Sequence, residues 1–473
     1  MDQAKTPLYT KLMSHADGKP FSFHVPGHKN GTVFPEKGQR FFADILKLDA
    51  TEITGLDDYH SAEGVILEAE ELLTDLFKTK KSFFLLNGST VGNLAMILAA
   101  IKEEDVVLVQ RNSHKSIMNG LMLAKARPVF ISPEYNENFA VAVGPSLKAV
   151  QAAIQQYPGA KALILTYPNY YGLTYDLKSI IDLAHRFRIP VLVDEAHGAH
   201  FIAGDFFPKS AVELGADLVV QSAHKTLPAM TMGAFLHYQT DRVPMSKLKS
   251  YLQALQSSSP SYPLMASLDL ARYYLGSYNQ EDLSYLKAAL QQFRISLGQL
   301  ESISVLPGDD PLKITIQSWS GFELQTKLEA KGIFTELADP YNVLFVLPLL
   351  KRNMGHYLQE AAEKITEIAR TIPKKINHLD TKWSAKGIST LAASYKEMEN
   401  QHSEYIPLEE AAGRVCAEPI IPYPPGIPIC VPGEFITEED IQLIFYLVGK
   451  DAKIQGGDNL SAGKISVFQS WRK

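Results

Sequence analysis

Short apolar segments alternate with helical segments between residues 82 and 238. Each apolar segment is almost continuously hydrophobic, which is typical of strands that are buried on both faces. The alternation of such strands with helices predicts an α/β domain in which helices cover both faces of a mostly parallel sheet. The expected strands are 82–86, 105–110, 128–131, 161–166, 191–194, 217–220 and 233–238. The expected helices are 65–77, 91–101, a stretch that follows Ser116 and ends at 124, and 176–188.

Two of these strands end in residues that can hold or react with a cofactor. One strand ends in Asp194, and the next is followed by Ser222, His224 and Lys225. Ligands of parallel sheets bind at the carboxyl ends of the strands. A strand-end acid followed by Ser-x-His-Lys is typical of enzymes that use pyridoxal phosphate (PLP). In such enzymes the lysine forms a Schiff base, the acid holds the ring-nitrogen proton, and the hydroxyls and imidazole bind the phosphate. A lone lysine or strand-end acid is usually a surface charge or a cap, so the prediction depends on both strand ends together.

The segment 87–90 joins an expected strand to an expected helix and contains Ser89 and Thr90. Backbone N–H groups at a helix N-terminus favour a phosphate, and the two hydroxyls add donors. The same residues would also serve as an ordinary helix cap, so this signal is weak alone. The phosphate-binding interpretation is supported by further polar residues that also follow expected strands: His114, Asn169 and His197.

The remaining segments suggest an arm and a second domain. We expect an N-terminal arm over residues 1–40, a PLP-binding domain over 41–276 and a smaller C-terminal region over 277–473. Residues 21–31 contain two histidines, but no acid or thiol stands at ligand spacing, so we expect no metal site there. The prolines of segment 256–263 predict an ordered loop. The proline-rich segment 422–434 is predicted to be rigid and irregular, and it ends in Glu434.

The composition excludes several classes of protein. The formal net charge of −6 argues against a nucleic-acid binder, which would need a basic surface. No apolar run is long enough for a membrane span, and the N-terminus lacks the apolar core of a signal peptide. The two cysteines, Cys416 and Cys430, make neither a disulfide framework nor a metal site. We therefore expect a cytoplasmic enzyme with a small-molecule substrate.

These motifs together resemble the bacterial ornithine/lysine/arginine decarboxylases, PLP enzymes of fold type I. The resemblance extends from residue 8 to about residue 450, and it is to the shorter branch, which lacks the extra N-terminal domain of the larger enzymes. The motifs that carry it are Phe23-His24-Val25-Pro26-Gly27-His28, Leu56-Asp57-Asp58, Asn87-Gly88-Ser89-Thr90, His114-Lys115-Ser116, Asp194-Glu195-Ala196-His197-Gly198, Ser222-Ala223-His224-Lys225, Ser259-Pro260-Ser261-Tyr262-Pro263, Pro424-Pro425-Gly426 and Pro432-Gly433-Glu434.

The resemblance implies a role for each site residue. Lys225 would form the Schiff base, Asp194 would pair with the pyridinium nitrogen, and His114 would stack on the ring. The phosphate would be bound by Ser89, Thr90, Ser222 and His224, with Ser257 or Ser258 contributed by a neighbouring subunit of a homodimer. Glu434 matches a position that receives the distal cation of the substrate. His197 would lie near the reacting carbon without an assigned role.

Two motifs depart from the family pattern. The family usually has Asn-Pro-Thr where this chain has Tyr167-Pro168-Asn169, which leaves contacts to the cofactor's ring hydroxyl open. The phosphate turn is commonly Gly-Thr-Ser, and Gly88-Ser89-Thr90 preserves its hydroxyl chemistry.

The resemblance implies decarboxylation of a basic amino acid to a polyamine precursor. Arginine is favoured because the short branch is associated with agmatine formation, and lysine and ornithine stay open. Fold alone does not exclude an aminotransferase or another PLP-dependent lyase. A catalytically silent regulatory relative is a further alternative, although Lys225, Asp194 and His114 are all retained.

Overall fold

The computed structural model describes residues 1–473 apart from 353, 355–356, 375–386, 423–425, 451 and 473. The chain divides into two compact units, each assembled from several separate segments. The first unit consists of Met1–Ala99, Val193–Lys287 and Pro348–Met354, and the second of Ala100–Leu192, Ala288–Leu347 and Gly355–Lys473. The expected boundaries after residues 40 and 276 stay a prediction.

In the first unit the strand order is β1-β9-β8-β7, and the boundary between the units falls within β7. β9 pairs antiparallel with both β1 and β8, so β1 and β8 run in the same direction. The connection from β8 to β9 consists of residues 222–233 and contains the single-turn helix α8. The bounds are β1 Lys81–Leu85, β7 Val191–Asp194, β8 Leu218–Gln221 and β9 Ala234–Tyr238, each within one residue of its expected range.

One helix of the first unit has its expected bounds, and another begins at a side-chain cap. α3 (Val65–Phe77) has the expected apolar face and packs on β1. α10 (Tyr262–Gly276) begins at Ser261, whose side chain accepts a hydrogen bond from the Leu264 N–H. The other helices are α1 Pro7–Asp17, α2 Glu36–Leu48, α4 Gly88–Ala100, α8 Ala223–Thr226 and α9 Met245–Leu255.

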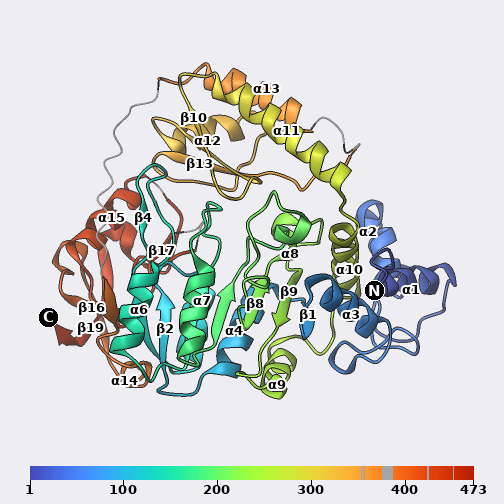
Figure 1. Cartoon of the computed structure of the whole chain (residues 1–473), viewed down its shortest axis with the longest axis horizontal. Helices are drawn as coiled ribbons and strands as arrows, with labels where there is room; N and C mark the ends of the chain where they lie inside the picture. Colours follow the sequence, from blue (N-terminus) through green and yellow to red (C-terminus); the bar gives the residue numbers. More distant parts are fainter. Residues whose placement is uncertain (353, 355–356, 375–386, 423–425, 451, 473) are drawn as a thin grey trace. The chain divides into compact units, whose positions relative to one another are not determined.

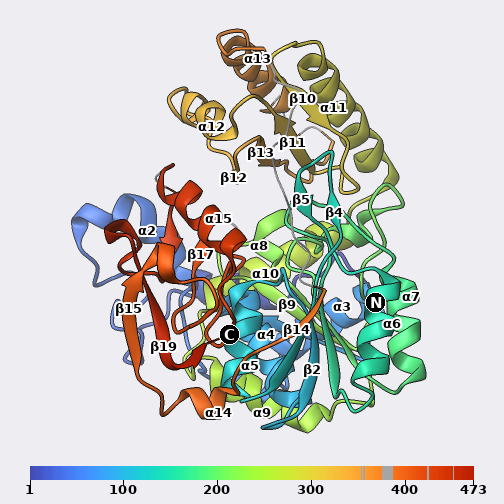
Figure 2. The same cartoon turned by 90° about the vertical axis from the view of Figure 1, so that its left-hand side faces the viewer.

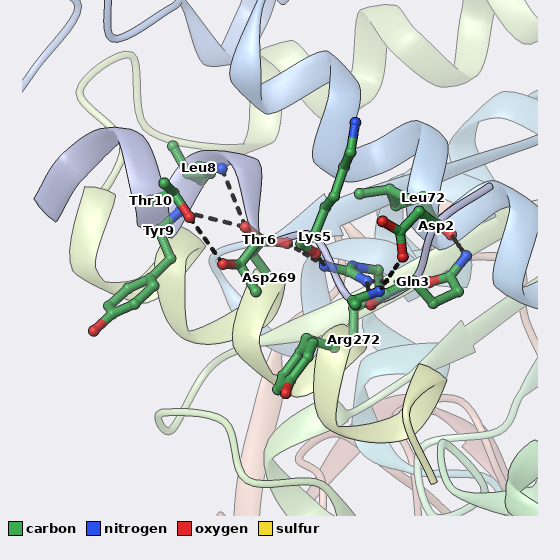
Figure 3. A network of polar contacts seen from close by, with 12 residues as sticks. Asp2, Gln3, Lys5, Thr6, Leu8, Tyr9, Thr10, Leu72, Asp269 and Arg272 are labelled. Atoms are coloured by element: carbon green, nitrogen blue, oxygen red, sulfur yellow. Dashed lines mark hydrogen bonds and ion pairs between the residues drawn. The ribbon is translucent and has the colours of Figure 1, made fainter. Parts of the chain in front are cut away.

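A buried ion pair fastens the N-terminus to α10 (Figure 3). The Arg272 guanidinium and the Asp269 carboxylate are 2.8 Å apart, and both side chains are fully buried. Arg272 also donates to the Gln3 carbonyl at 3.0 Å and to the Lys5 carbonyl. Asp269 accepts from the backbone N–H of Leu8 at 3.1 Å, near the start of α1. Residues 1–17 are therefore part of the folded unit and not a loose extension.

In the second unit the strand order is β6-β2-β3-β14. β2 pairs parallel with both β3 and β6, as expected, and β14 joins β3 antiparallel. Helix α6 packs against α7 and β3, and both helices lie on one face of these strands in the two views (Figures 1 and 2). The bounds are β2 Val106–Gln110, β3 Arg127–Ile131, β6 Ala162–Thr166, β14 Ile388–Thr390, α5 Lys115–Leu123, α6 Leu147–Gln156 and α7 Leu177–Arg186.

Smaller sheets complete the second unit. One antiparallel sheet has the order β10-β11-β13-β12, and a three-stranded sheet of order β15-β19-β16 lies further along the chain. The remaining elements are β4 Tyr135–Asn136, β5 Val141–Ala142, β10 Ser304–Leu306, β11 Lys313–Gln317, β12 Leu337–Ala338, β13 Asn342–Val346, β15 Ser403–Pro407, β16 Arg414–Cys416, β17 Ile421–Pro422, β18 Ile454–Gln455, β19 Lys464–Arg472, α12 Gly321–Glu329, α13 Tyr357–Ala369, α14 Tyr395–Met398 and α15 Glu438–Val448, with α11 (Gln280–Gly298) crossing the boundary between units.

Cys416 and Cys430 are both buried free thiols.

Pro424 and Pro425 of the expected proline-rich segment lie outside the described residues. Within the described ranges, none of the helices combines the length and apolar composition that a membrane crossing requires.

Candidate active site

The turn between β1 and α4 forms the expected anion-binding arrangement in the first unit. Gly88 has φ +74°, a conformation that glycine adopts without strain, and its N–H donates to the Met232 carbonyl at 2.9 Å. Ser89 and Thr90 then occupy the first turn of α4. The Ser222 hydroxyl donates to Ser89 Oγ at 2.9 Å, so two predicted phosphate ligands from separate strand ends are in contact.

Lys225 lies on α8, the single helical turn that follows β8. Its Nζ is 3.0 Å from Nε2 of His197, a buried side chain just beyond β7. His224 Nδ1 donates to the Gly233 carbonyl at 2.9 Å, which orients its imidazole. The structure thus brings the predicted reactive amine and the unassigned histidine within hydrogen-bond distance of each other.

Asp194 is buried at the end of β7 and receives a hydrogen bond on each carboxylate oxygen. Asn93 Nδ2 donates to Oδ2 at 2.9 Å, and the Ala196 N–H donates to Oδ1 at 3.1 Å. The two hydrogen bonds fix the orientation of the carboxylate at the end of β7.

A buried polar network continues from the residue after Asp194. Glu195 accepts from Ser210 Oγ at 2.7 Å, the Ala211 N–H at 2.6 Å and Gln221 Nε2 at 2.6 Å. Burial nevertheless raises the pKa of Glu195 to about 8. Gln221 Oε1 accepts from His237 Nε2 at 3.0 Å. These contacts join the ends of β7 and β8 to β9 and hold the strand end that carries Asp194.

Ser257 and Ser258 are exposed in the loop that follows α9. The loop is anchored at Gln256, whose Oε1 accepts from the Leu86 N–H at 2.9 Å and whose Nε2 donates to Tyr59 at 2.6 Å. His60 Nε2 also contacts the Ser257 carbonyl at 2.9 Å. This is the ordered loop that its prolines predict.

His114 belongs to the second unit and is the N-cap of α5. Its Nδ1 accepts from the Ser116 N–H at 3.2 Å and lies 2.9 Å from Ser116 Oγ. These contacts orient the imidazole ring. Asn169 lies in the loop whose sequence, Tyr167-Pro168-Asn169, differs from the family pattern. Its buried side chain donates to the Ala142 carbonyl and accepts from the Leu173 N–H, so its amide stabilises the loop.

Glu434, also in the second unit, forms a buried ion pair with Arg111. Arg111 Nε is 2.8 Å from Oε1, and Arg111 Nη2 is 2.6 Å from Oε2. Burial alone would lower the pKa of Arg111, but the Glu434 carboxylate outweighs that effect and raises it. Both oxygens of the predicted substrate anchor therefore already accept from a guanidinium group.

The side chains of the first unit fit PLP in chemical type. They comprise hydroxyls and an imidazole for the phosphate, a carboxylate with a buried amide donor for the ring nitrogen, and a primary amine for the aldehyde. The donors and acceptors come from three chain segments that the fold brings together: Ser89, Asn93, Asp194, Ser222, His224 and Lys225.

The sequence matches the models of two domains of one family. The Orn/Lys/Arg decarboxylase major domain matches residues 6–319, and the C-terminal domain of the same family matches residues 380–454. The chain belongs to this family. It is a PLP-dependent amino acid decarboxylase of fold type I, as the motifs predict.

Several relatives of this decarboxylase are similar along nearly their whole length. The chain is 46% identical to the uncharacterised protein YaaO of Bacillus subtilis, covering 98% of each chain. It is 36% identical to an arginine decarboxylase of the same organism, covering 99% of each. The crystal structure of the Francisella novicida lysine decarboxylase LdcF shares the fold with a TM-score of 0.80 and 21% identity, over 98% of this chain and 81% of that one.

Some functional contacts of the decarboxylase were not predicted from its sequence. Asn93 is a polar residue inside an otherwise apolar helix, four positions after Ser89, and that position was a usable signal. Glu195 and Gln221 stand beside predicted site residues, but their mutual contact depends on how β7 and β8 align. Arg111 directly follows β2, yet nothing local indicates a partner as distant as Glu434.

Proposed function

We propose that this decarboxylase acts on arginine and releases carbon dioxide and agmatine. The observation that carries the choice is the 36% identity over 99% of both chains to an arginine decarboxylase of Bacillus subtilis. Lysine and ornithine, which would give cadaverine and putrescine, are the competing substrates. The expected cytoplasmic location stays a prediction.

The proposed roles follow from the contacts within the first unit and, for His114 of the second unit, from the family resemblance. Lys225 is the amine that bonds the cofactor covalently, and Asp194 holds the proton of the ring nitrogen, itself oriented by Asn93. Ser89, Thr90, Ser222 and His224 bind the phosphate. His114 stacks on the ring. When bound, PLP withdraws the electron pair that departing carbon dioxide leaves on the substrate.

Proton return to the substrate carbon is assigned to Lys225 and His197. Their Nζ and Nε2 atoms are 3.0 Å apart, so a proton can pass between them without an intervening water. His197 is 5% exposed, which limits competition from bulk solvent.

We also propose a homodimer in which Ser257 or Ser258 contributes to the neighbour's phosphate site. The exposed serines directly follow Gln256, the residue that anchors their loop, and this anchoring suits a rigid contact with a second chain. Large apolar side chains are exposed in the segment 21–42, among them Phe21 at 95%, Phe23 at 97% and Phe41 at 78%. Exposed apolar surface of this kind is typical of a protein interface.

The family resemblance indicates Glu434 as the position that would receive the substrate's distal cation. The ion pair with Arg111 weighs against this role, because a substrate guanidinium would compete with one already held at 2.8 and 2.6 Å.

The test of the proposed function is a product assay with arginine, lysine and ornithine. Arginine should give the highest kcat/KM, with carbon dioxide and amine released in equal amounts. Lys225→Ala should abolish turnover, and borohydride reduction of wild-type enzyme should fix the cofactor to the peptide that contains Lys225. Accumulation of a keto acid would instead identify an aminotransferase. A bound cofactor without turnover of any of the three would identify a silent relative.

A further inference from the structure

The side chains of Arg111 and Glu434 form a two-point contact that is nearly sealed from solvent. Their side chains are 12% and 6% exposed, and two parallel N–H···O bonds of 2.8 and 2.6 Å join them. Bidentate arginine–carboxylate pairs combine strength with a fixed orientation. Arg111 directly follows β2, so the pair connects a strand end to a segment 323 positions further along the chain.

The same guanidinium also binds the backbone that leads to Glu434. Arg111 Nη1 donates to the Pro428 carbonyl at 3.0 Å, and Nη2 donates to the Ile429 carbonyl at 2.9 Å. Glu434 additionally accepts from the Val431 N–H at 3.1 Å. One arginine thus holds the chain from 428 to 434 against the end of β2.

The loop 111–115 is held from its other end as well. The Lys115 N–H donates to the Gly426 carbonyl at 3.0 Å, and Lys115 Nζ donates to Gln455. His114 lies between the two attachment points, Arg111 and Lys115. The C-terminal segment 426–434 therefore contacts the loop on both sides of the histidine that is proposed to stack on the cofactor.

We infer that Arg111 and Glu434 are a positioning pair that sets the loop carrying His114. In this role Glu434 acts through Arg111 and does not receive the substrate's cation. The inference rests on the proposed function, in which His114 stacks on the PLP ring. It assigns the C-terminal segment 426–434 a positioning role in catalysis, because that segment fixes the position of His114.

The test compares holoenzyme variants Glu434→Gln and Arg111→Gln. Each should lower kcat at least about tenfold while KM stays within about twofold, since an interaction that orients the chemical step is lost. Each should also alter the visible circular dichroism of the bound cofactor, because the ring neighbour has moved. The kcat of the double variant should be no lower than that of the less active single variant, because the effects of residues that act as a unit do not add.

Glu404→Gln is the matched control. Glu404 pairs with Arg414 at 2.8 Å in the same unit, and that arginine is 10% exposed. This control should leave kcat and the cofactor's dichroism unchanged. If it lowers both as much as Glu434→Gln does, general loosening of the second unit explains the effect and the inference is wrong.

A different kinetic result would show that Glu434 binds the substrate's cation. A tenfold or greater rise in KM for arginine, with kcat and dichroism unchanged, would overturn the positioning role. Unchanged kcat, KM and dichroism would overturn it too. Should Glu434→Gln fail to fold, Glu434→Asp, which keeps the charge but shortens the reach, takes its place in every comparison.

Hydrogen exchange separates failure of this inference from failure of the proposed function. The Lys115 amide, which bonds to Gly426, should exchange at least about tenfold faster in Glu434→Gln than in wild type or Glu404→Gln. This measurement needs no turnover. Unchanged exchange would refute the coupling, whichever substrate the enzyme uses.

Discussion

Asn93 donates its side-chain amide to Asp194 Oδ2 over 2.9 Å, and 101 positions separate the two residues in sequence. Both side chains are buried, Asn93 at 0% and Asp194 at 3% exposure. The carboxylate that is proposed to hold the ring-nitrogen proton is thus itself held by an amide from α4. Because α4 begins at the phosphate turn, one helix orients two parts of the proposed cofactor site.

The first prediction follows from this contact. Asn93→Leu keeps the approximate volume but removes the donor to Asp194, and a hydrogen bond to a charged group contributes about 1.5–3 kcal/mol. We expect kcat to fall about tenfold to a hundredfold, with the cofactor still attached to Lys225. Steady-state kinetics and the cofactor absorbance check this. Wild-type turnover in the variant would show that Asp194 needs no orienting partner.

The second prediction concerns Asp194 itself. Asp194→Asn has nearly the same shape but lacks the charge that holds the ring-nitrogen proton. We expect kcat to fall at least about a hundredfold, the usual scale for a lost electrostatic contact to the reacting group. KM should change much less, because the substrate is still bound. Near-normal turnover would rule out the proposed role of Asp194.

The third prediction tests whether Ser257 and Ser258 serve the neighbouring chain. Lys225→Ala and a variant with both serines replaced by glutamate should each be inactive. In a mixed dimer both lesions fall on one site and the other site is intact. Refolding an equal mixture should therefore restore roughly a quarter of the wild-type sites if chains pair at random. Mixed dimers that form but stay inactive would place the loop in its own chain's site.

The fourth prediction concerns the N-terminal anchor of Figure 3. Arg272→Met leaves Asp269 as a buried charge without its guanidinium partner. Breaking such a pair costs about 3–5 kcal/mol, so the apoenzyme should show a clearly lower Tm. Lys178→Met removes an exposed ion pair with Asp182 and should shift Tm little. Equal shifts in the two variants would contradict a special role for the buried pair.

The fifth prediction is a pH dependence of stability from His237. Burial lowers the pKa of this histidine from 6.5 to about 3. Between these values the unfolded chain binds a proton that the folded chain does not, so stability falls as the pH decreases below about 6.5. The Tm advantage of wild type over His237→Gln should therefore narrow between pH 7 and pH 5. A Tm difference that is constant over this pH range would contradict a neutral, buried His237.

Local pattern was sufficient to predict the strands β1, β2, β3, β6, β7, β8 and β9, the helices α3, α4, α5 and α7, and most of the residues proposed to bind PLP. The strand that ends in Asp194 and the turn of Ser89 are contiguous stretches, and their hydrophobicity, caps and glycine act within a few residues. The antiparallel direction of β9 was not predicted. The connection from β8, residues 222–233, is long enough for either direction, so the packing of the strands decides it.

The sequence by itself determined the chemistry that this decarboxylase can carry: a lysine, an acid, hydroxyls and histidines at the ends of buried strands. Only the tertiary structure decided the partners of those groups, such as Asn93 for Asp194 and Arg111 for Glu434. Such pairs join residues 101 and 323 positions apart. Their geometry depends on how whole elements pack, and no local pattern contains that information. For that reason the acidic character of Glu434 could be read directly, whereas its guanidinium partner could not.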